Sequence, residues 1–215
     1  MRILALSDKV VPALYSPAIQ EIVGAVDLVV SCGDLPTYYL DYVSSMLGVR
    51  CLMVHGNHAS GQEFVDPWDL NAPPRDPMDL DGRVVLEKGL VIAGLDGSIR
   101  YNRNPRFQYS QAEMWRKVWR LAPSLAWRRM TQGRWLDLLV THSPPAGIHD
   151  GPDHAHQGFA AFLWLMRAFK PRYLLHGHKH VYRHDEVTKT DYRGTRVINV
   201  YPWRIIETGT MNDER

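Results

Sequence analysis

The chain has 215 residues, of which 45% are hydrophobic and 22% charged, with 16 Gly and 14 Pro. This composition is that of an ordinary globular protein and excludes a disordered, collagen-like or coiled-coil chain, and the length suits a single α/β domain over residues 1–215. The net charge of +2 does not by itself indicate nucleic-acid binding, because attraction to phosphate backbones needs clustered positive charge.

The N-terminal sequence gives no signal for export or membrane insertion. Only residues 3–6 are apolar before the first polar residues, which is far short of a signal-peptide core, and no apolar run reaches the ~18 residues of a membrane span. Cys32 and Cys51 stand in apolar stretches and predict buried free thiols rather than disulfides. We therefore expect a soluble cytoplasmic protein with no membrane partner.

Short runs of Val, Ile and Leu recur between helix-like segments and predict buried strands. These runs are Ile3–Leu6, Leu28–Val30, Leu52–Val54, Val84–Leu86, Val91–Ala93, Leu136–Val140, Tyr173–Leu175 and Val197–Val200. Helices are expected from Ser16-Pro17 to about Val26, from a Thr37 cap to about Leu47, from the Ser110 capping box over Gln111 to about Leu121, and over Gly158–Phe169. The proline-rich segment from Asp66 to Gly82 predicts a long loop.

Side chains that can bind metals follow five of these strands. They are Asp8, Asp34, Asn57 with His58, His142, and His178 with His180. In open α/β sheets the carboxyl ends of the strands form the ligand crevice, so these residues are expected to converge. Glycine beside three of the groups lets the backbone approach a bound group closely. This set of Asp, Asn and His suits Mn²⁺, Fe or catalytic Zn²⁺ better than a closed structural zinc site.

Each of these features alone has an ordinary structural explanation. An Asp after a strand is commonly a helix cap or turn former, Gly-Asn-His is commonly a turn, and a lone His142 is commonly a hydrogen-bonded buried histidine. Their ordered occurrence favours the metal site, because the structural explanation requires five independent coincidences at strand ends.

The residues in this order resemble the calcineurin-like metallophosphoesterase superfamily, whose pattern is Asp-x-His, Gly-Asp, Gly-Asn-His, a lone His and Gly-His-x-His. The resemblance extends from Asp8 to His180. Further segments look like its small single-domain branch of predicted (Icc-like) phosphoesterases: Gly94–Ser98 with Tyr101-Asn102, Gln108–Ser110 and Thr141–Pro145. The fold that the resemblance implies is a four-layer α/β/β/α sandwich of two mixed sheets flanked by helices, with the metals at the strand ends.

The resemblance also implies two divalent metal ions of the Mn, Fe or Zn class, with Mn favoured. Asp34 would bridge them, with Asp8 and His180 on the first ion and Asn57, His142 and His178 on the second. His58 would be catalytic, donating a proton to the leaving oxygen or stabilising charge on the phosphoryl group. Two cations about 3.5 to 4 Å apart can hold and acidify a bridging water while they clamp the phosphate oxygens.

Two positions depart from the family pattern. Val10 stands where the family has a histidine, so the first metal site lacks a ligand and is expected to bind more weakly or with a different metal preference. Ala59 stands where an acidic residue commonly orients the preceding histidine, which is expected to lower the basicity of His58 or free its ring. Lys9 is an alternative source of positive charge, although strand alternation would point it away from Asp8.

Three further features lie around the expected site. His149 and His156 belong to the loop 147–158, which either caps the following helix or overhangs the metals and contacts the substrate phosphate. Arg100 is a candidate substrate contact, because arginine binds phosphate oxygens in a bidentate manner. The segment Trp115–Trp135 is basic and aromatic, and its helical spacing predicts tryptophans packed inward, while the alternative is a surface that stacks bases or meets a partner.

The leading hypothesis is a divalent-metal-dependent phosphoesterase, with a phosphodiesterase slightly favoured, acting on a small phosphate ester of the nucleotide or cyclic nucleotide class. The first alternative is a catalytically weakened metal-binding scaffold or interaction protein, which Val10 and Ala59 support. The second is a nuclease that uses the basic aromatic segment, so nucleic acid is an open but not favoured partner. No oligomeric state is predicted.

Overall fold

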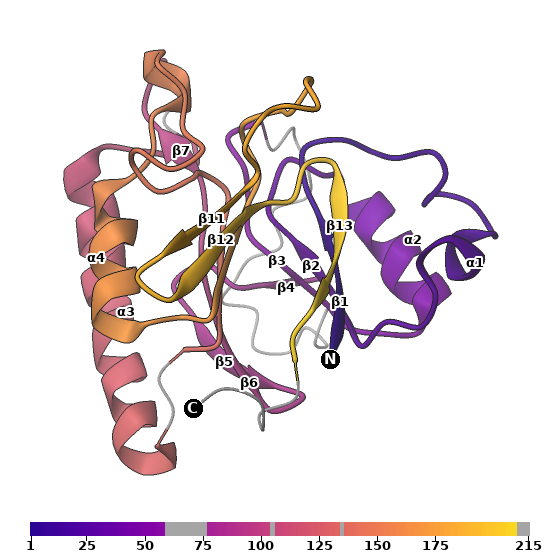
Figure 1. Cartoon of the computed structure of the whole chain (residues 1–215), viewed down its shortest axis with the longest axis horizontal. Helices are drawn as coiled ribbons and strands as arrows, with labels where there is room; N and C mark the ends of the chain where they lie inside the picture. The colour runs from indigo at the N-terminus through magenta and orange to yellow at the C-terminus, as the bar shows by residue number, and fades with distance from the viewer. Residues whose placement is uncertain (59–76, 104–105, 134–135, 210–215) are drawn as a thin grey trace.

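A computed structural model describes residues 1–58, 77–103, 106–133 and 136–209 of the chain. Two mixed sheets face each other, and helices cover their outer faces (Figure 1). The first sheet has the order β13 (Trp203–Glu207), β1 (Arg2–Leu6), β2 (Leu28–Ser31), β3 (Cys51–Met53), β4 (Met78–Asp79). The second has the order β11 (Lys189–Tyr192), β12 (Thr195–Asn199), β10 (Tyr173–His176), β9 (Leu138–Thr141), β6 (Leu90–Leu95), β5 (Val84–Glu87).

The remaining elements complete the layers. The helices are α1 (Ile19–Val23), α2 (Thr37–Leu47), α3 (Gln111–Gln132) and α4 (Ala160–Phe169), with a short 3-10 turn η1 (His154–His156). A small parallel pair is formed by β7 (Ser98–Ile99) and β8 (Gln108–Tyr109). Strands β1, β2 and β3 are parallel to one another, as are β6, β9, β10 and β12, so within each sheet their carboxyl ends lie at a common edge.

Three apolar cores separate the four layers. Along β1 the side chains alternate, with Ile3 and Ala5 facing the second sheet and Leu4 and Leu6 facing α1 and α2. This alternation explains why the run lacks polar residues: both faces of the strand are buried. The third core lies between the second sheet and the helices α3 and α4. The predicted α/β/β/α sandwich is confirmed, and each expected strand overlaps an observed one.

The first helix begins later than the sequence indicates, and the second begins one residue earlier. Ser16 does not cap a helix, because its hydroxyl donates to the carbonyl of Ala13, and α1 starts only at Ile19. Thr37 is the first residue of α2 rather than its cap, since Pro36 holds the cap position without a side-chain hydrogen bond. Both predictions placed helices correctly and their starts wrongly.

Helix α3 begins at the predicted capping box, in which Ser110 and Glu113 satisfy each other's backbone N–H groups. It continues to Gln132, well past the expected end near Leu121, and carries Pro123 inside it. The apolar stripe explains the extension, because Leu121 and Leu125 are both buried against the second sheet.

The tryptophans of α3 are only partly inward. Trp115 packs against the core and meets Trp164 of α4 edge to face, as predicted. Trp119 and Trp127 are 56% and 66% exposed, so the expectation of inward packing is wrong for these two. Trp135 lies outside the described residues.

A buried ion cluster ties the end of β6 to α3. The ammonium of Lys117 lies 2.8 Å from the Asp81 carboxylate, also contacts Asp96, and sits 4.0 Å from the ring centre of Tyr109. Burial and the nearby Asp81 charge raise the pKa of Asp96 to about 7, although Lys117 opposes this. The segment Gly94–Ser98 thus contributes a structural cluster as well as a turn.

Strand β4 lies inside the segment expected to be a loop, and it pairs in parallel with β3. Residues 66–76 of that segment lie outside the described residues, as does Ala59. The edge strands β11 and β13, each antiparallel to its neighbour, were not predicted from the sequence either. Cys32 and Cys51 are buried free thiols, as predicted. Within the described part of the chain, none of the helices has the length and hydropathy that crossing a bilayer requires.

Candidate metal centre

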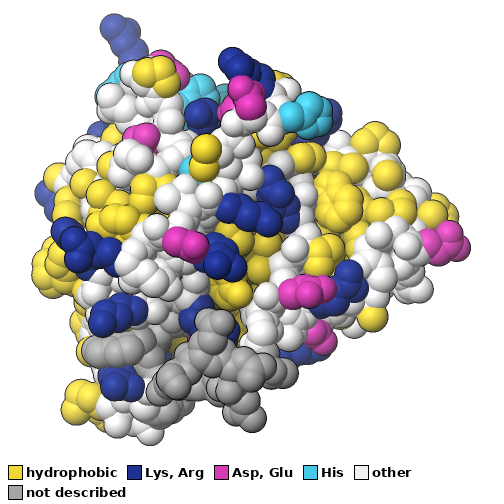
Figure 2. All heavy atoms as spheres, viewed as in Figure 1, with side chains coloured by type: hydrophobic (Ala, Val, Ile, Leu, Met, Phe, Trp, Pro, Cys, Tyr) yellow, Lys and Arg dark blue, Asp and Glu magenta, His cyan; other side chains and the backbone are white. Residues whose placement is uncertain are grey.

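The candidate ligands sit in tight turns that follow the strands. Asp8 after β1, Asp34 after β2 and His178 after β10 all have left-handed backbones, with φ values of 61°, 56° and 66°. A left-handed conformation costs a non-glycine residue roughly 1–2 kcal/mol, so three of them at one edge mark a site where geometry overrides local preference. Figure 2 shows histidine side chains gathered along this upper edge of the molecule.

Three glycines make room for these side chains. A Cβ atom on Gly56 would lie 2.0 Å from Oδ1 of Asp34, and one on Gly177 would lie 2.4 Å from Oδ2 of Asp8. A Cβ on Gly33 would lie 2.6 Å from Nδ1 of His142. The glycines noted in the sequence therefore permit the close approach of the ligands themselves.

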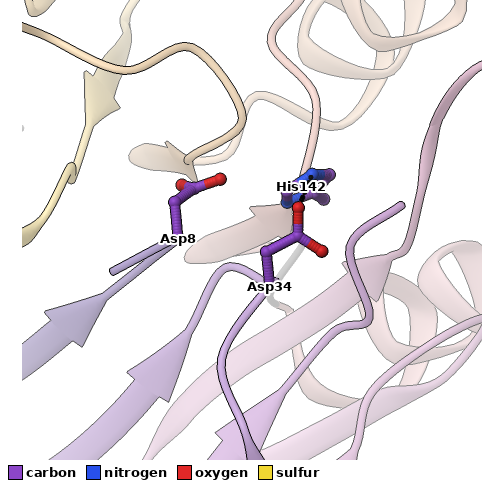
Figure 3. A group of neighbouring side chains, drawn as sticks. All are labelled: Asp8, Asp34 and His142. Carbon is purple, nitrogen blue, oxygen red and sulfur yellow. Dashed lines mark ion pairs between the residues drawn. The ribbon is translucent and has the colours of Figure 1, made fainter. Parts of the chain in front are cut away.

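Asp8, Asp34 and His142 form the centre of the site (Figure 3). One ligand atom from each lies within 4.8 Å of the others, and the side chains are almost entirely buried. Two carboxylates and an imidazole at this spacing are a suitable donor set for a divalent cation.

The hydrogen bonds of His142 leave one nitrogen facing oxygen acceptors. Its Nδ1 lies 2.8 Å from the carbonyl of Cys32, to which it donates, and its Nε2 lies 2.9 Å from Oδ1 of Asn57 and 3.4 Å from Oδ2 of Asp34. The amide nitrogen of Asn57 donates to the hydroxyl of Tyr101 at 2.9 Å, which fixes the amide oxygen toward His142. These atoms converge on a position that calls for a cation, so the residues present fit a metal ion.

The electrostatics agree with a site built for positive charge. Burial lowers the pKa of His142, but Asp34 and Asp8 outweigh it and raise the pKa to about 9. Burial raises the pKa of Asp34, but His142 and the backbone N–H of His58, 2.8 Å from Oδ1, bring it down to about 2. The carboxylates therefore stay ionised, and a metal ion competes with the proton on His142.

His178 and His180 both approach this centre through Asp8. The backbone N–H of His178 donates to both oxygens of Asp8 at 3.2 and 3.0 Å, and its Nε2 donates to the carbonyl of Ala155 at 2.8 Å, which leaves Nδ1 with its lone pair. Burial and the charge of His142 lower the pKa of His178 to about 4, so the ring is neutral at pH 7. The Nε2 atom of His180 lies 3.7 Å from Oδ1 of Asp8.

Two of the predicted catalytic and substrate-binding residues, His58 and His156, lie next to the candidate ligands. His58 is exposed and follows Asn57 directly, with its backbone bound to Asp34. His156 packs its ring 5.1 Å from that of His178, and its Nδ1 is held by Asp153 at 2.8 Å. Both therefore lie beside the candidate ligands.

His149 and Arg100 are engaged elsewhere. The two ring nitrogens of His149 lie 2.9 Å from Nε2 of His176 and 2.9 Å from the hydroxyl of Thr190, and the residue lines a pocket of about 370 Å³. The guanidinium of Arg100 binds both carboxylate oxygens of Glu113, at 3.0 and 2.9 Å, at the start of α3. The structure thus gives each of them a protein partner.

Residues that orient the ligands were not assigned this role from the sequence. Tyr101 holds Asn57, Asp153 holds His156, and Tyr182 and Tyr201 contact His180. Only the position of Tyr101 beside the Gly94–Ser98 segment offered a signal. Val10, at the place of the missing histidine, packs against the apolar core of α1 and α2.

Comparison of the sequence with family models matches residues 1–182 to the calcineurin-like phosphoesterases. The chain therefore belongs to the calcineurin-like phosphoesterase family. As a member of that family it is a metal-dependent phosphoric ester hydrolase, as the order of its motifs predicted. No curated protein matches the chain significantly.

The comparison with solved structures finds several chains of similar fold, of which one has a TM-score above 0.5 among the three described next. TT1561 of Thermus thermophilus is 14% identical with a TM-score of 0.59, covering 93% of this chain and 88% of that one. Vacuolar protein sorting 29 from Cryptosporidium parvum is 13% identical with a TM-score of 0.46, covering 93% and 72%. A metallophosphoesterase from Sphaerobacter thermophilus is 18% identical with a TM-score of 0.37, covering 96% and 84%. The first likeness supports the fold alone, and the other two TM-scores are too low to support an inference.

Proposed function

We propose that the chain is a phosphodiesterase that hydrolyses a small phosphate ester of the nucleotide or cyclic nucleotide class, with two divalent ions, Mn²⁺ favoured. The observation that carries this proposal is the convergence of Asp8, Asp34 and His142 from the ends of β1, β2 and β9, with the oxygen of Asn57 turned toward His142. Convergent carboxylate, amide and imidazole donors are suited to holding metal ions that in turn bind a phosphate.

Contacts among the candidate ligands support the two groups that the family resemblance implies. Asp8 and His180 approach each other, and His142 contacts both Asn57 and the ring of His178, while the backbone N–H of His178 joins the two groups through Asp8. Asp34 would be the residue shared by both ions, because a carboxylate offers two oxygens and a ligand atom of Asp34 lies within 4.8 Å of ligand atoms of both Asp8 and His142.

The chain's own residues then have distinct tasks. When bound, the two ions supply a nucleophilic water and neutralise the phosphate charge. Asn57 is a neutral donor and does not cancel that positive charge. His58 is exposed at the edge of the site, where its ring can donate a proton to the oxygen of the departing alcohol. His156, held by Asp153, contributes a donor to a phosphate oxygen.

The preference for a diester has support in the charges around the site. Nη2 of Arg100, the arginine considered as a substrate contact, is bound to Glu113, so this nitrogen is engaged by the protein rather than by a substrate phosphate. A phosphodiester carries one negative charge, so it needs less cationic help from side chains than the dianion of a monoester does. The specificity for a small nucleotide-type ester rests on the family resemblance.

The test is hydrolysis by the chelator-stripped chain with and without Mn²⁺. We expect added Mn²⁺ to restore hydrolysis, with bis(p-nitrophenyl) phosphate cleaved faster than p-nitrophenyl phosphate. Asn57→Ala is expected to abolish this Mn²⁺-dependent hydrolysis. Asn102→Ala, at an exposed position outside the ligand set, is the matched control. Turnover that survives chelation would exclude the metal mechanism, and faster monoester cleavage would reverse the proposed substrate preference.

A nuclease is the second candidate, because Trp119 and Trp127 are exposed on the basic helix α3. Exposed aromatic rings beside arginines can stack bases. This function requires binding of a single-stranded oligonucleotide that weakens steeply with salt and is reduced in Trp127→Ala. Absence of binding at low salt rules it out.

A further inference from the structure

The first metal site has fewer protein ligands than the second. Its family histidine is replaced by Val10, which is partly buried and packs against the core of α1 and α2. Its remaining imidazole, His180, lies on the turn after β10 with 41% of its side chain exposed. An exposed imidazole samples several ring orientations, so something must orient it if the site is to bind a metal with three protein ligands.

Two tyrosines hold the His180 ring. The Tyr182 hydroxyl oxygen lies 2.8 Å from Nδ1 of His180. The Tyr201 ring stacks on the imidazole with centroids 4.6 Å apart and planes 18° apart. Tyr182 also meets Tyr201 edge to face, with ring centroids 6.2 Å apart, so the three rings form one cluster.

We propose that Tyr182 and Tyr201 are positioning residues that orient His180 toward the first metal ion and compensate for the ligand lost at Val10. This inference rests on the proposed function, since it takes His180 as a metal ligand. Tyr182 fixes the proton and Tyr201 fixes the plane of the ring.

The tautomer follows from the two nitrogens of His180. Nε2 faces the Asp8 side, at 3.7 Å from Oδ1, so it is the nitrogen that must keep a lone pair for a metal. The proton then resides on Nδ1, which donates to the Tyr182 oxygen. Loss of such an outer partner typically weakens metal binding about 10–100-fold. With only three protein ligands at this site, the imidazole carries a larger share of the binding.

The experiment measures Mn²⁺ binding to the stripped full-length chain by calorimetry and by loss of the free Mn²⁺ EPR signal. For the weaker of the two sites we expect Tyr182→Phe to reduce affinity at least about tenfold, with the stronger site unchanged. Tyr201→Leu is expected to act in the same direction, whereas Tyr201→Phe keeps the stack and the affinity. Tyr38→Phe, on the exposed face of α2, is the control for tyrosine replacement itself.

A double-mutant cycle separates positioning from a general structural effect. In a His180→Ala background, Tyr182→Phe is expected to cause no further loss of Mn²⁺ affinity, because the ring it orients is gone. An equal loss in both backgrounds, or wild-type affinity in Tyr182→Phe with hydrolysis intact, overturns this inference and leaves the proposed function standing. A wild-type chain that binds no Mn²⁺ and cleaves no diester overturns both.

Discussion

Gly56 offers a stringent test of the metal centre, because the smallest possible side chain there collides with a ligand. In Gly56→Ala the added Cβ would lie 2.0 Å from Oδ1 of Asp34 and 2.7 Å from Cε1 of His142. Ordinary C···O contacts are about 3.3 Å or longer, so the Asp34 carboxylate or the loop must move by about 1.3 Å. Gly56 is not in the left-handed region, so the effect is steric rather than conformational.

A displacement of this size at a reacting centre costs roughly 100-fold in rate, so we expect kcat/KM for bis(p-nitrophenyl) phosphate to fall by about that factor in Gly56→Ala. The overpacking is expected to lower the free energy of unfolding by about 1–3 kcal/mol. The assay is a Mn²⁺ titration of hydrolysis beside a thermal melt, with Gly209→Ala as control, where the added Cβ meets nothing within 4 Å. Wild-type metal affinity and turnover in Gly56→Ala would refute the placement of Asp34 in the site.

Three further outcomes follow from the charges and packing. Adding Mn²⁺ to the stripped chain at about 100 times its Kd is expected to stabilise it by about 2.7 kcal/mol per ion, or roughly 5–10 °C in a melting scan, and His142→Ala is expected to lose most of that shift. Val10→His is expected to lower Tm without raising Mn²⁺ affinity, because Val10 is partly buried against the core of α1 and α2. A large gain in Mn²⁺ affinity would contradict this and show that a histidine at position 10 can reach the first metal ion. The pKa of Asp96 is about 7 in the folded chain and 3.8 in the unfolded chain, so between about pH 4 and 7 the folded chain holds a proton that the unfolded chain has lost. The free energy of unfolding should therefore fall as the pH rises through this range. Asp96→Asn should flatten that fall in denaturant melts, and an unchanged slope would contradict the raised pKa.

The apolar runs were sufficient to predict the strands that carry the ligands, and the sandwich itself was predicted through the family resemblance. Buried strands have continuous apolar runs, and β1 shows why: Ile3 and Leu4 face different cores. The edge strands β11 and β13 were not predicted, because apolar and polar residues mix in their sequences and their strand structure depends on pairing with a neighbouring strand. Helix α3 extends past its predicted end, because burial of Leu125 stabilises the helix by more than Pro123 destabilises it.

The site was predicted through residue types rather than through their contacts. Convergence of Asp8, Asp34 and His142 followed from strand ends and motif order, and the geometry places them together. The engagement of Arg100 with Glu113 could not be foreseen, because it joins a loop to a helix start thirteen positions away. The contacts of Tyr182 and Tyr201 with His180 could not be predicted either, since Tyr201 reaches the ring from a separate part of the chain.

The ligand candidates divide between the two sheets by chemistry. Asp8, Asp34 and Asn57 follow strands of the first sheet, and His142, His178 and His180 follow strands of the second. All the oxygen donors thus come from one layer and all the nitrogen donors from the other. An ion bound between them would be coordinated by both layers at once, so separating the sheets would also require breaking its coordination. Metal binding and the association of the two sheets would then be thermodynamically coupled, and loss of the ion would weaken the packing at the edge where both sheets end.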